Sequence, residues 1–380
     1  MAPMRLRILV LPGDGIGPEI VAQAVRVLQA VGQRFGHEIE CADAPIGAAA
    51  IHLTGSALPE GTKRLALDAD AVLLGAVGLP EFDGLPPGQR PERGLLELRK
   101  LLGVYANLRP VRALPGLVGS SPLKADVVAG TDLIVVRELT AGLYYGEPRG
   151  ISGDGPETRA VNTMTYTRAE IERIARLAFE LARTRRRHVT SVDKSNVLEN
   201  SRLWRQVVID VAAEYPDVAL DHLFVDNCAM QLVIKPTRFD VLLTENMFGD
   251  ILSDEAAVLA GSIGLLSSAS IGERKPLGLR GGLYEPIHGS APDIAGRGVA
   301  NPIGTIRSVA AMFDYGFGLK DEAQAIENAV EASIASGIVT PDLSPAGRAS
   351  TTAEVGDAIC EAIAASAARA AARPPSAPAV

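Results

Sequence analysis

The chain of 380 residues carries 37 lysine and arginine side chains against 45 aspartate and glutamate side chains, a formal net charge of -8. This acidic excess disfavours nonspecific attraction to nucleic acid or to an anionic membrane surface, so we expect neither partner. Hydrophobic residues make up 47% of the chain, which suits one large or two medium domains with a buried core.

Cysteine usage and the N-terminal segment both indicate a cytoplasmic protein. Cys41, Cys228 and Cys360 are odd in number, lie far apart and form no CxxC motif, so we expect reduced thiols rather than disulfides or a thiolate metal site. The opening MAPMRLRILVLPGDGIG is typical of a first strand and not of a signal peptide. No apolar run reaches the length that spans a bilayer.

Short apolar runs alternate with helical patterns along the chain. The strand-then-helix pairs are 5–11 with 18–35, 69–77 with 94–102, 188–193 with 201–215, and 239–246 with 247–261. This alternation predicts an α/β protein whose mainly parallel sheet is covered on both faces. Functional side chains should then collect at the strand ends.

The first glycine-rich loop, LPGDGIGPE, follows a strand and opens a helix. Its glycines, Gly13, Gly15 and Gly17, recur as G-x-G-x-G, whereas the dinucleotide-binding fingerprint is G-x-G-x-x-G. A tight strand-to-helix turn with Pro18 near the first helical position explains the spacing better, and the loop could still border a ligand.

Three further segments depart from the alternation. Residues 140–166 are rich in Gly, Thr and Tyr and predict hairpins or an arm that could pair with a second subunit. The basic run at 183–188 suits the C-terminal end of a helix better than a nucleic-acid site. Residues 364–380 are rich in Ala and Pro, and we expect a frayed helix end and a disordered tail.

Carboxylates form the first candidate site. Asp250 and Asp254 lie four apart in the helical stretch MFGDILSDEAAVLAG, and Asp226 lies upstream in VDNCAMQL. Two carboxylates so spaced share a helix face and repel each other unless a cation lies between them. Without nearby His or Cys clusters, oxygen ligands favour Mg²⁺ or Mn²⁺ over zinc. On spacing alone, an exposed acidic helix face is the better explanation of the pair.

The second candidate site is the segment 281–302, GGLYEPIHGSAPDIAGRGVANP, which has neither helical nor strand periodicity. A structureless loop of this length is either functional or disordered. Its glycines would let backbone N–H groups approach phosphates, His288 and Asn301 can hydrogen-bond a base or an amide, and Asp293 can accept from ribose hydroxyls. A mobile surface loop is the alternative.

Read together, these segments resemble the 3-isopropylmalate dehydrogenases, within the wider family of β-decarboxylating dehydrogenases that act on isocitrate, homoisocitrate and D-malate. The resemblance runs from about residue 5 to 362. It is carried by LPGDGIGPEI, LLGAVG, RPERGLLELRKLLGVYANLRPV, VRELTAGLYYGEPRG, SVDKSNVLENSRLW, VDNCAMQLV, TENMFGDILSDEAAVLAGSIGLL and GLYEPIHGSAPDIAGRGVANP.

The resemblance implies the isocitrate/isopropylmalate dehydrogenase-like fold rather than an ordinary Rossmann fold, with two domains sharing a large mixed sheet. Residues 1–104 and 263–363 would form a discontinuous cofactor-binding domain. Residues 105–262 would form the dimerisation and substrate/metal domain, with the arm near 140–166. The implied assembly is a homodimer in which each active site borrows residues from its neighbour.

The implied reaction is the oxidative decarboxylation of (2R,3S)-3-isopropylmalate to 4-methyl-2-oxopentanoate with reduction of NAD, in leucine biosynthesis. Guanidinium forks suit the two substrate carboxylates, and Arg99, Arg109 and Arg137 match the family's positions. The implied metal ligands are Asp226, Asp250 and Asp254. Asp226, which is expected to contact substrate as well, would come from the partner subunit.

Two side chains match the family's proton-transfer groups. Lys194 is the expected general base and would also come from the partner subunit, while Tyr144 in ELTAGLY is the expected general acid. The adjacent Tyr145 stands where many relatives have Phe, so alignment by one residue matters. Without the resemblance, a surface lysine and a core tyrosine would explain both positions.

Substrate choice is expected to depend on RPERGLLELRK. Glu92, Leu95, Leu96 and Arg99 share one face of the predicted helix. The two leucines suit an isopropyl group, whereas the extra carboxylate of isocitrate would be costly to bury against them. A plain amphipathic helix with core leucines is the alternative.

The cofactor assignment depends on Asp293, whose carboxylate would repel a 2′-phosphate and with Ile294 resembles the NAD form, so we predict NAD rather than NADP. The remaining positions that match the cofactor loop are Glu285, His288, Gly289, Ser290, Ala291 and Asn301. Two rival interpretations stay open: a paralogue acting on another 3-alkylmalate or D-malate, and a noncatalytic regulatory subunit of the same fold.

Overall fold

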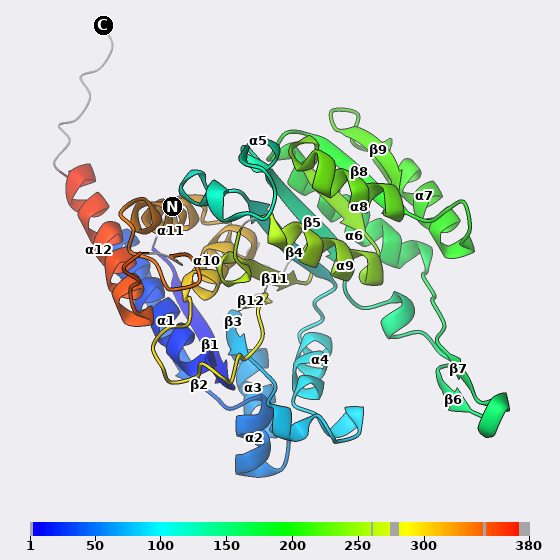
Figure 1. Cartoon of the computed structure of the whole chain (residues 1–380), viewed down its shortest axis with the longest axis horizontal. Helices are drawn as coiled ribbons and strands as arrows, with labels where there is room; N and C mark the ends of the chain where they lie inside the picture. The colour runs from blue at the N-terminus through cyan, green and yellow to red at the C-terminus, as the bar shows by residue number, and fades with distance from the viewer. Residues whose placement is uncertain (1–2, 260, 274–280, 345–346, 372–380) are drawn as a thin grey trace, which may run out of the picture. The chain divides into compact units, whose positions relative to one another are not determined.

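The computed structural model describes residues 3–259, 261–273, 281–344 and 347–371. The chain divides into two compact units, unit 1 (Met1–Leu102 and Arg274–Val380) and unit 2 (Gly103–Glu273), which Figure 1 colours along the chain. The predicted boundary after residue 262 was placed too early. Strand β11 (Ser267–Ile271) pairs antiparallel with β4 (Ala106–Arg112), so residues up to 273 belong to unit 2.

Unit 1 is built from a four-stranded parallel sheet and seven helices of its described residues. The strands are β1 (Arg5–Gly13), β2 (Glu38–Asp43), β3 (Ala71–Ala76) and β12 (Gly282–Pro286), in the order β2-β1-β3-β12. The helices are α1 (Gly17–Phe35), α2 (Gly47–Thr54), α3 (Glu60–Asp68), α4 (Glu92–Leu101), α10 (Ile303–Ala311), α11 (Lys320–Ala335) and α12 (Thr352–Ala371).

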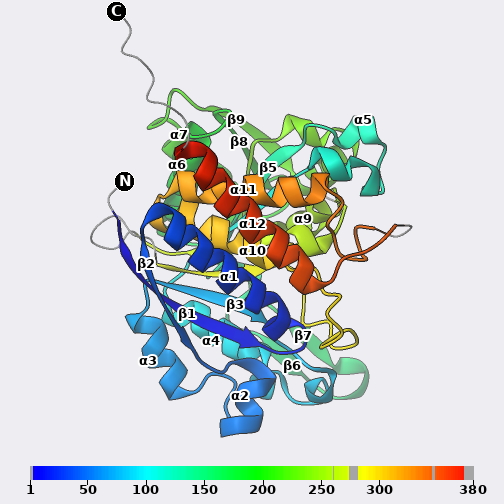
Figure 2. The ribbon, with the colours of Figure 1, turned by 90° about the vertical axis from the view of Figure 1, so that its left-hand side faces the viewer.

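Helices cover both faces of the unit 1 sheet, as Figure 2 shows for α1 on one side and α2 and α3 on the other. Strand β3, with the sequence AVLLGA, is buried at every position, as expected for a parallel strand covered on both faces. On the α2–α4 side, Leu9, Leu11, Ile46, Leu74 and Leu98 belong to one apolar core cluster.

Unit 2 holds a mixed sheet of six strands in the order β11-β4-β5-β10-β8-β9. The pairs β11–β4 and β4–β5 are antiparallel, and the others are parallel. The remaining strands are β5 (Asp132–Glu138), β8 (His188–Asp193), β9 (Ala219–Phe224) and β10 (Val241–Thr244). The helices are α5 (Ala125–Val128), α6 (Arg168–Arg183), α7 (Glu199–Ala212), α8 (Val225–Ile234) and α9 (Asn246–Val258).

The predicted arm at 140–166 contains a hairpin of unit 2. Strands β6 (Gly150–Ser152) and β7 (Arg159–Val161) pair antiparallel, and every residue in them is exposed. In Figure 1 this hairpin projects away from the rest of unit 2. Ile151 is 78% exposed, so the arm carries an apolar side chain with no cover in one chain.

The predicted disordered tail at 364–380 starts too early. Helix α12 continues to Ala371, and Arg34 of α1 donates a hydrogen bond to the hydroxyl of Ser366. Contact with α1 therefore supports a segment whose composition alone indicated fraying. Residues 372–380 lie outside the described part of the chain.

The first glycine loop is a strand-to-helix turn, as predicted. Strand β1 ends at Gly13, α1 begins at Gly17, and Pro18 occupies the first turn of the helix. The other predicted strand-to-helix pairs are confirmed as β3 with α4, β8 with α7, and β10 with α9.

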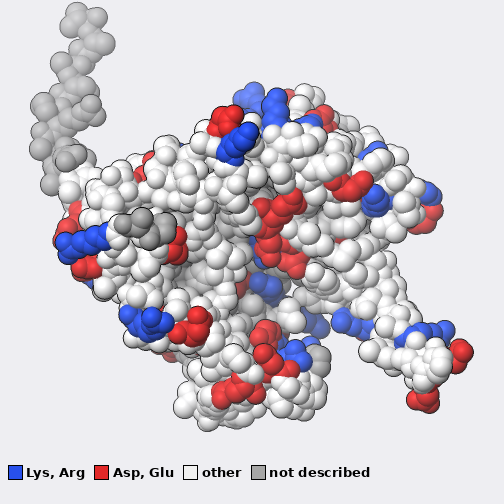
Figure 3. All heavy atoms as spheres, viewed as in Figure 1, with Lys and Arg blue, Asp and Glu red and all other residues white. Residues whose placement is uncertain are grey.

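The basic run at 183–188 makes ion pairs inside unit 2. Arg183 pairs with Asp217 at 2.5 Å, and Arg185 pairs with Asp132 at 2.7 Å and with Asp240 at 2.8 Å. On the face drawn in Figure 3, the described basic side chains are interspersed with acidic ones. Among the helices of the described residues, none combines the length and apolar character needed to cross a membrane.

Candidate active site

Helix α9 organises the candidate site of unit 2. Its N-cap residue Glu245 accepts hydrogen bonds from two backbone N–H groups of the first turn, which fixes the start of the helix. Asp250 and Asp254 follow one turn apart on the same face. Asp250 accepts from the hydroxyl of Tyr144 at 2.9 Å and pairs with Arg137, while Asp254 pairs with Arg109 at 2.8 Å.

The structure thus brings together five predicted site residues from four separate segments. Both arginine side chains are largely buried, with 6% of Arg137 and 11% of Arg109 exposed, whereas 63% of Asp254 is exposed. A buried guanidinium needs paired acceptors to offset its loss of hydration. The cluster therefore holds two fixed cations beside two carboxylates that remain open to solvent.

Sequence reasoning missed the residue that orients Arg137. Asn246 is fully buried, its carbonyl oxygen accepts from Arg137 Nε at 3.0 Å and Nη2 at 2.8 Å, and its amide donates to the carbonyl of Ala141 at 3.0 Å. A signal was present in NMFGD. At Gly249 a Cβ atom would stand 2.6 Å from Arg137 Cγ, so only glycine lets the arginine cross the helix there.

Arg109 is likewise held by residues that the sequence did not indicate. Its Nε donates to Asn107 Oδ1 at 2.9 Å and its Nη1 donates to Ser253 Oγ at 2.6 Å. Asn107 is itself buried and donates to Ser268 at 2.8 Å and Ser270 at 3.1 Å on β11. Strand β11 therefore helps to orient Arg109 through Asn107.

Tyr144 remains a neutral phenol at physiological pH. Burial raises its pKa, and the hydrogen bond that it donates to the Asp250 carboxylate raises it further, to about 12. Its side chain is still reachable, because the residue is 40% exposed. A protonated, accessible hydroxyl beside carboxylates is a suitable proton donor.

Lys194 and Asp226 form a second group in unit 2. Lys194 follows β8 directly, Asp226 lies in the first turn of α8, and their side chains are 2.6 Å apart. The hydrogen bond from Lys194 lowers the pKa of the Asp226 carboxyl. Within the described part of one chain, His, Cys, Asp and Glu do not gather three at a time into a metal-binding group.

In unit 1 the predicted substrate helix α4 has a buried side and an open side. Leu98 and Gly94 are buried, Leu95 packs partly on the apolar core, and Leu96 is 43% exposed. Arg99 donates to Glu285 Oε1 at 2.6 Å, so a predicted substrate residue and a predicted cofactor residue are direct partners. Glu92 is exposed at the start of the helix.

The predicted structureless loop 281–302 was partly wrong, because its first residues form the buried strand β12, with Glu285 near its end. Leu283 and Tyr284 are buried in the core and support this strand, although the glycines obscured the apolar pattern in the sequence. Beyond β12 the chain is irregular up to α10.

The remaining cofactor-loop residues are held in place by unit 1. Ser290 donates to the carbonyl of Gly78 at 2.5 Å and accepts from the backbone of Ile16 at 2.8 Å, so the first glycine loop borders this segment. Asn301 donates to Asp342 at 3.0 Å. Ala291 adopts a positive φ of 37°, whereas Gly289 and Asp293 are exposed and Ile294 is half-buried.

His288 carries an unused hydrogen-bonding atom. Its Nδ1 lies 2.9 Å from the carbonyl of Gly289, while its Nε2 is buried without a partner in the described structure. Burial lowers the pKa of this imidazole, so the ring is neutral at physiological pH. An orphaned buried nitrogen in an irregular loop is a suitable contact for a ligand.

One more anchor, Asp14, was missed within the first glycine loop. Its buried carboxylate accepts from the backbone N–H groups of Ala48 at 2.9 Å, Ala49 at 2.8 Å and Gly78 at 2.7 Å. These bonds join the start of α2 to the segment that also accepts the Ser290 hydrogen bond.

A family model described as isocitrate/isopropylmalate dehydrogenase matches residues 7–359. The chain belongs to this family. A 3-isopropylmalate dehydrogenase of Shouchella clausii (strain KSM-K16) is 56% identical over 352 residues, covering 92% of this chain and 95% of the relative. One of Aquifex aeolicus (strain VF5) is 55% identical over 356 residues, covering 93% and 96%.

Solved structures of the family show the same fold. An isocitrate dehydrogenase from Methylococcus capsulatus superposes with a TM-score of 0.81 at 38% identity, covering 94% of this chain and 99% of the other. A β-decarboxylating dehydrogenase from Thermococcus kodakarensis gives 0.78 at 38%, covering 97% and 99%. The predicted fold class and the prediction of a decarboxylating dehydrogenase are confirmed.

Proposed function

We propose that this chain catalyses the oxidative decarboxylation of (2R,3S)-3-isopropylmalate to 4-methyl-2-oxopentanoate with reduction of NAD, a step of leucine biosynthesis. The observation that carries the substrate is the open side of α4, where Leu96 is 43% exposed one turn before Arg99. An accessible leucine beside a guanidinium suits a substrate with both an isopropyl group and a carboxylate.

Three arginines bind the substrate carboxylates in this proposal. Arg109 and Arg137 are buried, charged and held by asparagine acceptors, so their guanidinium forks are oriented before substrate arrives. Arg99 completes the set from unit 1. Each is paired with a carboxylate of the same chain, and a substrate carboxylate can take the same donors.

Asp250 and Asp254 fit a hard divalent cation, Mg²⁺ or Mn²⁺, because both are carboxylates on one face of α9 with solvent-exposed side chains. When bound, such an ion would act as a Lewis acid on the substrate's C2 oxygen and stabilise the enolate charge. Among the described residues of one chain, no three possible metal ligands gather at this position, and we propose that Asp226 of a second copy completes the site.

Proton transfer falls to Lys194 and Tyr144. Lys194, also from the second copy, would remove the proton of the C2 hydroxyl, and bound NAD would supply the hydride acceptor for this oxidation. Carbon dioxide would then be lost from the adjacent carbon. The neutral phenol of Tyr144 returns a proton to the enol carbon. Glu92 would lie near the nicotinamide.

The cofactor segment 285–301 supplies the NAD contacts. The orphaned Nε2 of His288 and the backbone around Gly289, Ser290 and Ala291 are available to the nucleotide. The exposed carboxylate of Asp293, followed by Ile294, favours a ribose with a free 2′-hydroxyl over a 2′-phosphate. Glu285 and Asn301 border the segment.

A homodimer is supported by uncovered apolar side chains on two helices of unit 2 that contact each other. The most exposed are Met230 at 55% and Ile234 at 64% on α8, and Ile251 at 59% and Val258 at 53% on α9. An apolar face of this kind suits a second copy. We place the dimer in the cytoplasm, in keeping with three free cysteines.

A substrate panel with NAD or NADP and either Mg²⁺ or Mn²⁺ tests the proposal. Burying three carbons of the isopropyl group is worth about 2.4 kcal/mol, so we expect kcat/KM for 3-isopropylmalate to exceed that for D-malate roughly 50-fold. A preference for D-malate, isocitrate or homoisocitrate would assign the chain to a paralogue. NADH formation from none of them would indicate a regulatory subunit.

A further inference from the structure

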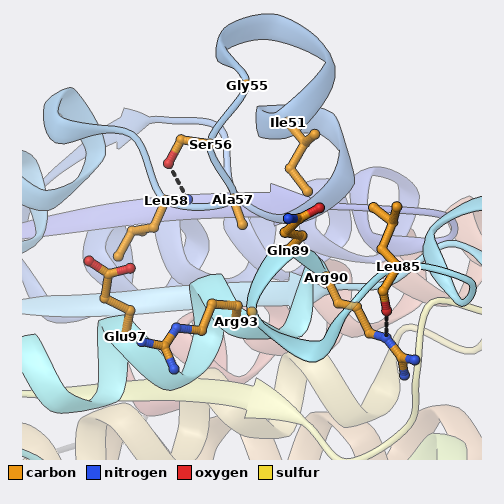
Figure 4. A pocket seen from close by; sticks show the side chains of 11 residues that line it. Ile51, Gly55, Ser56, Ala57, Leu58, Leu85, Gln89, Arg90, Arg93 and Glu97 are labelled. Atoms are coloured by element: carbon orange, nitrogen blue, oxygen red, sulfur yellow. Dashed lines mark hydrogen bonds between the residues drawn. The ribbon is translucent and has the colours of Figure 1, made fainter.

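A cavity of about 400 Å³ lies in unit 1 behind the substrate helix. Figure 4 shows its walls, which come from the end of α2, the segment 55–58 that follows it, the loop 85–90 and α4. The volume falls in the range of sites for small organic molecules. None of its lining residues belongs to the predicted active site.

The cavity meets α4 at residues that lie between its predicted substrate residues in the sequence. Arg93 and Glu97 line the cavity one turn apart, whereas Leu96 and Arg99 do not line it. Leu96 follows Arg93 by three residues and so neighbours it on the surface of the helix. Tight packing links α4 to the cavity wall, because a Cβ atom at Gly94 would stand 2.6 Å from the carbonyl oxygen of Ala57. A molecule in this cavity would therefore touch the helix that selects the substrate.

The polar groups of the cavity carry charges of both signs. The side chain of Arg93 is exposed and has no hydrogen-bond or ion-pair partner among the described residues, and the Nε of Arg90 donates to the carbonyl of Leu85 at 2.8 Å. Glu97 lies 2.8 Å from Lys63, but Lys63 also pairs with Glu60 at 2.7 Å, so one cation faces two carboxylates.

These charges are arranged beside apolar walls. In Figure 4, Arg93 and Glu97 are neighbours at one side of the cavity, and Ile51 and Leu85 lie at the other. A guanidinium and a carboxylate one helical turn apart offer partners of opposite charge for the carboxylate and the ammonium group of an amino acid. The aliphatic wall matches a branched side chain.

We propose that this cavity binds a free aliphatic α-amino acid, with its carboxylate on Arg93, its ammonium on Glu97 and its side chain against Ile51 and Leu85. Binding joins α4 to the end of α2 and so alters how α4 presents Leu96 and Arg99. This second effect rests on the proposed function, whereas binding does not depend on it.

Titration calorimetry of the full chain with L-leucine tests binding directly. Three probes each omit one recognition element: 4-methylpentanoate lacks the ammonium, 3-methylbutylamine lacks the carboxylate, and glycine lacks the side chain. We expect saturable binding of L-leucine and at least about tenfold weaker binding of each probe. Absence of L-leucine binding, or equal binding of any probe, would overturn the proposal.

The Arg93→Gln variant tests whether L-leucine binds in this cavity. It should weaken L-leucine binding about tenfold or more, whereas Lys100→Gln removes a charge from the same helix outside the cavity and should leave binding unchanged. Equal binding by the wild type and Arg93→Gln, or displacement of L-leucine by 3-isopropylmalate, would show that the amino acid binds elsewhere. L-leucine should shift the KM for 3-isopropylmalate in the wild type and not in Arg93→Gln.

Discussion

Opposite charges in the candidate site of unit 2 are matched residue by residue. Arg137 pairs with Asp250, Arg109 with Asp254, and Lys194 with Asp226. Each pair joins an expected substrate or proton-transfer group to an expected metal ligand. Cations and carboxylates therefore hold one another in place, and the same side chains can exchange partners when a dianionic substrate and a divalent cation bind.

Asp250→Asn should abolish metal-dependent turnover while the protein stays folded. Arg137 keeps both hydrogen bonds to Asn246, so no buried guanidinium loses its only acceptors. We expect kcat/KM to fall at least about 100-fold, since even residues that only support metal ligands cost up to that much. Steady-state rates across a Mg²⁺ series provide the measurement.

Asp210→Asn is the matched control, because it removes an exposed aspartate of unit 2 that pairs with Arg168 outside the site. It should behave as the wild type. If Asp250→Asn retained the wild-type dependence on Mg²⁺, Asp250 would not be a ligand.

Tyr144→Phe should impair protonation of the enol and leave the fold intact, because among the described residues the lost hydroxyl bonds to the accessible Asp250 carboxylate alone. Loss of a positioned general acid typically costs about 10²–10⁴-fold in rate. Tyr145→Phe supplies the control: this neighbour is 41% exposed and should be dispensable. If Tyr145→Phe reduced the turnover rate and Tyr144→Phe did not, the general acid would be Tyr145.

At the level of elements, α4 determines substrate choice in our account. Leu96→Ala should lower the preference for 3-isopropylmalate over D-malate about tenfold, because an accessible leucine contributes contact area without supporting the core. The ratio of the two kcat/KM values measures it. Leu67→Ala in α3, at a position 57% exposed, should not change this ratio; an unchanged ratio in Leu96→Ala would remove that leucine from the pocket.

The cofactor segment should respond to acid through His288. Burial lowers the pKa of this imidazole below its ordinary value of about 6.5, so the neutral form stabilises the folded state above that pH. The contribution is lost as the pH falls through the folded-state pKa, with a slope of up to about 1.4 kcal/mol per pH unit.

His288→Gln removes this titration. The free energy of unfolding, measured with urea at about pH 7 and about pH 5.5, should therefore decrease less in the variant than in the wild type. Equal decreases would mean that His288 does not titrate differently in the two states.

At the scale of the whole molecule, the hydrophobic periodicity was sufficient to predict secondary-structure elements. The sequence motifs were sufficient to predict the family. The run at 5–11 became β1 because a buried parallel strand reads as a largely apolar segment, and the run at 188–193 became β8 although it contains His, Thr, Ser and Asp. Strand β12 was missed because its flanking glycines hide a five-residue strand. The extent of α12 was missed because its support from Arg34 comes from the other end of the chain.

Site residues with distinctive chemistry were predictable, whereas their supports were not. The motif carriers indicated Asp250 and Tyr144, and the structure places them 2.9 Å apart. Asn246, Asn107 and Asp14 hold the site through buried hydrogen bonds, and a buried amide or carboxylate looks like any surface polar residue in a sequence.

Mixed dimers test most directly whether two copies share each active site. Asp226→Asn and Asp250→Asn chains are each refolded alone and together, and NADH formation from 3-isopropylmalate is measured. If Asp226 acts across the dimer, a mixed dimer has one intact site, so the equimolar mixture should recover about a quarter of wild-type activity. If Asp226 acts within its own chain, every site in the mixture is damaged, and recovery no greater than the separate variants would contradict the account.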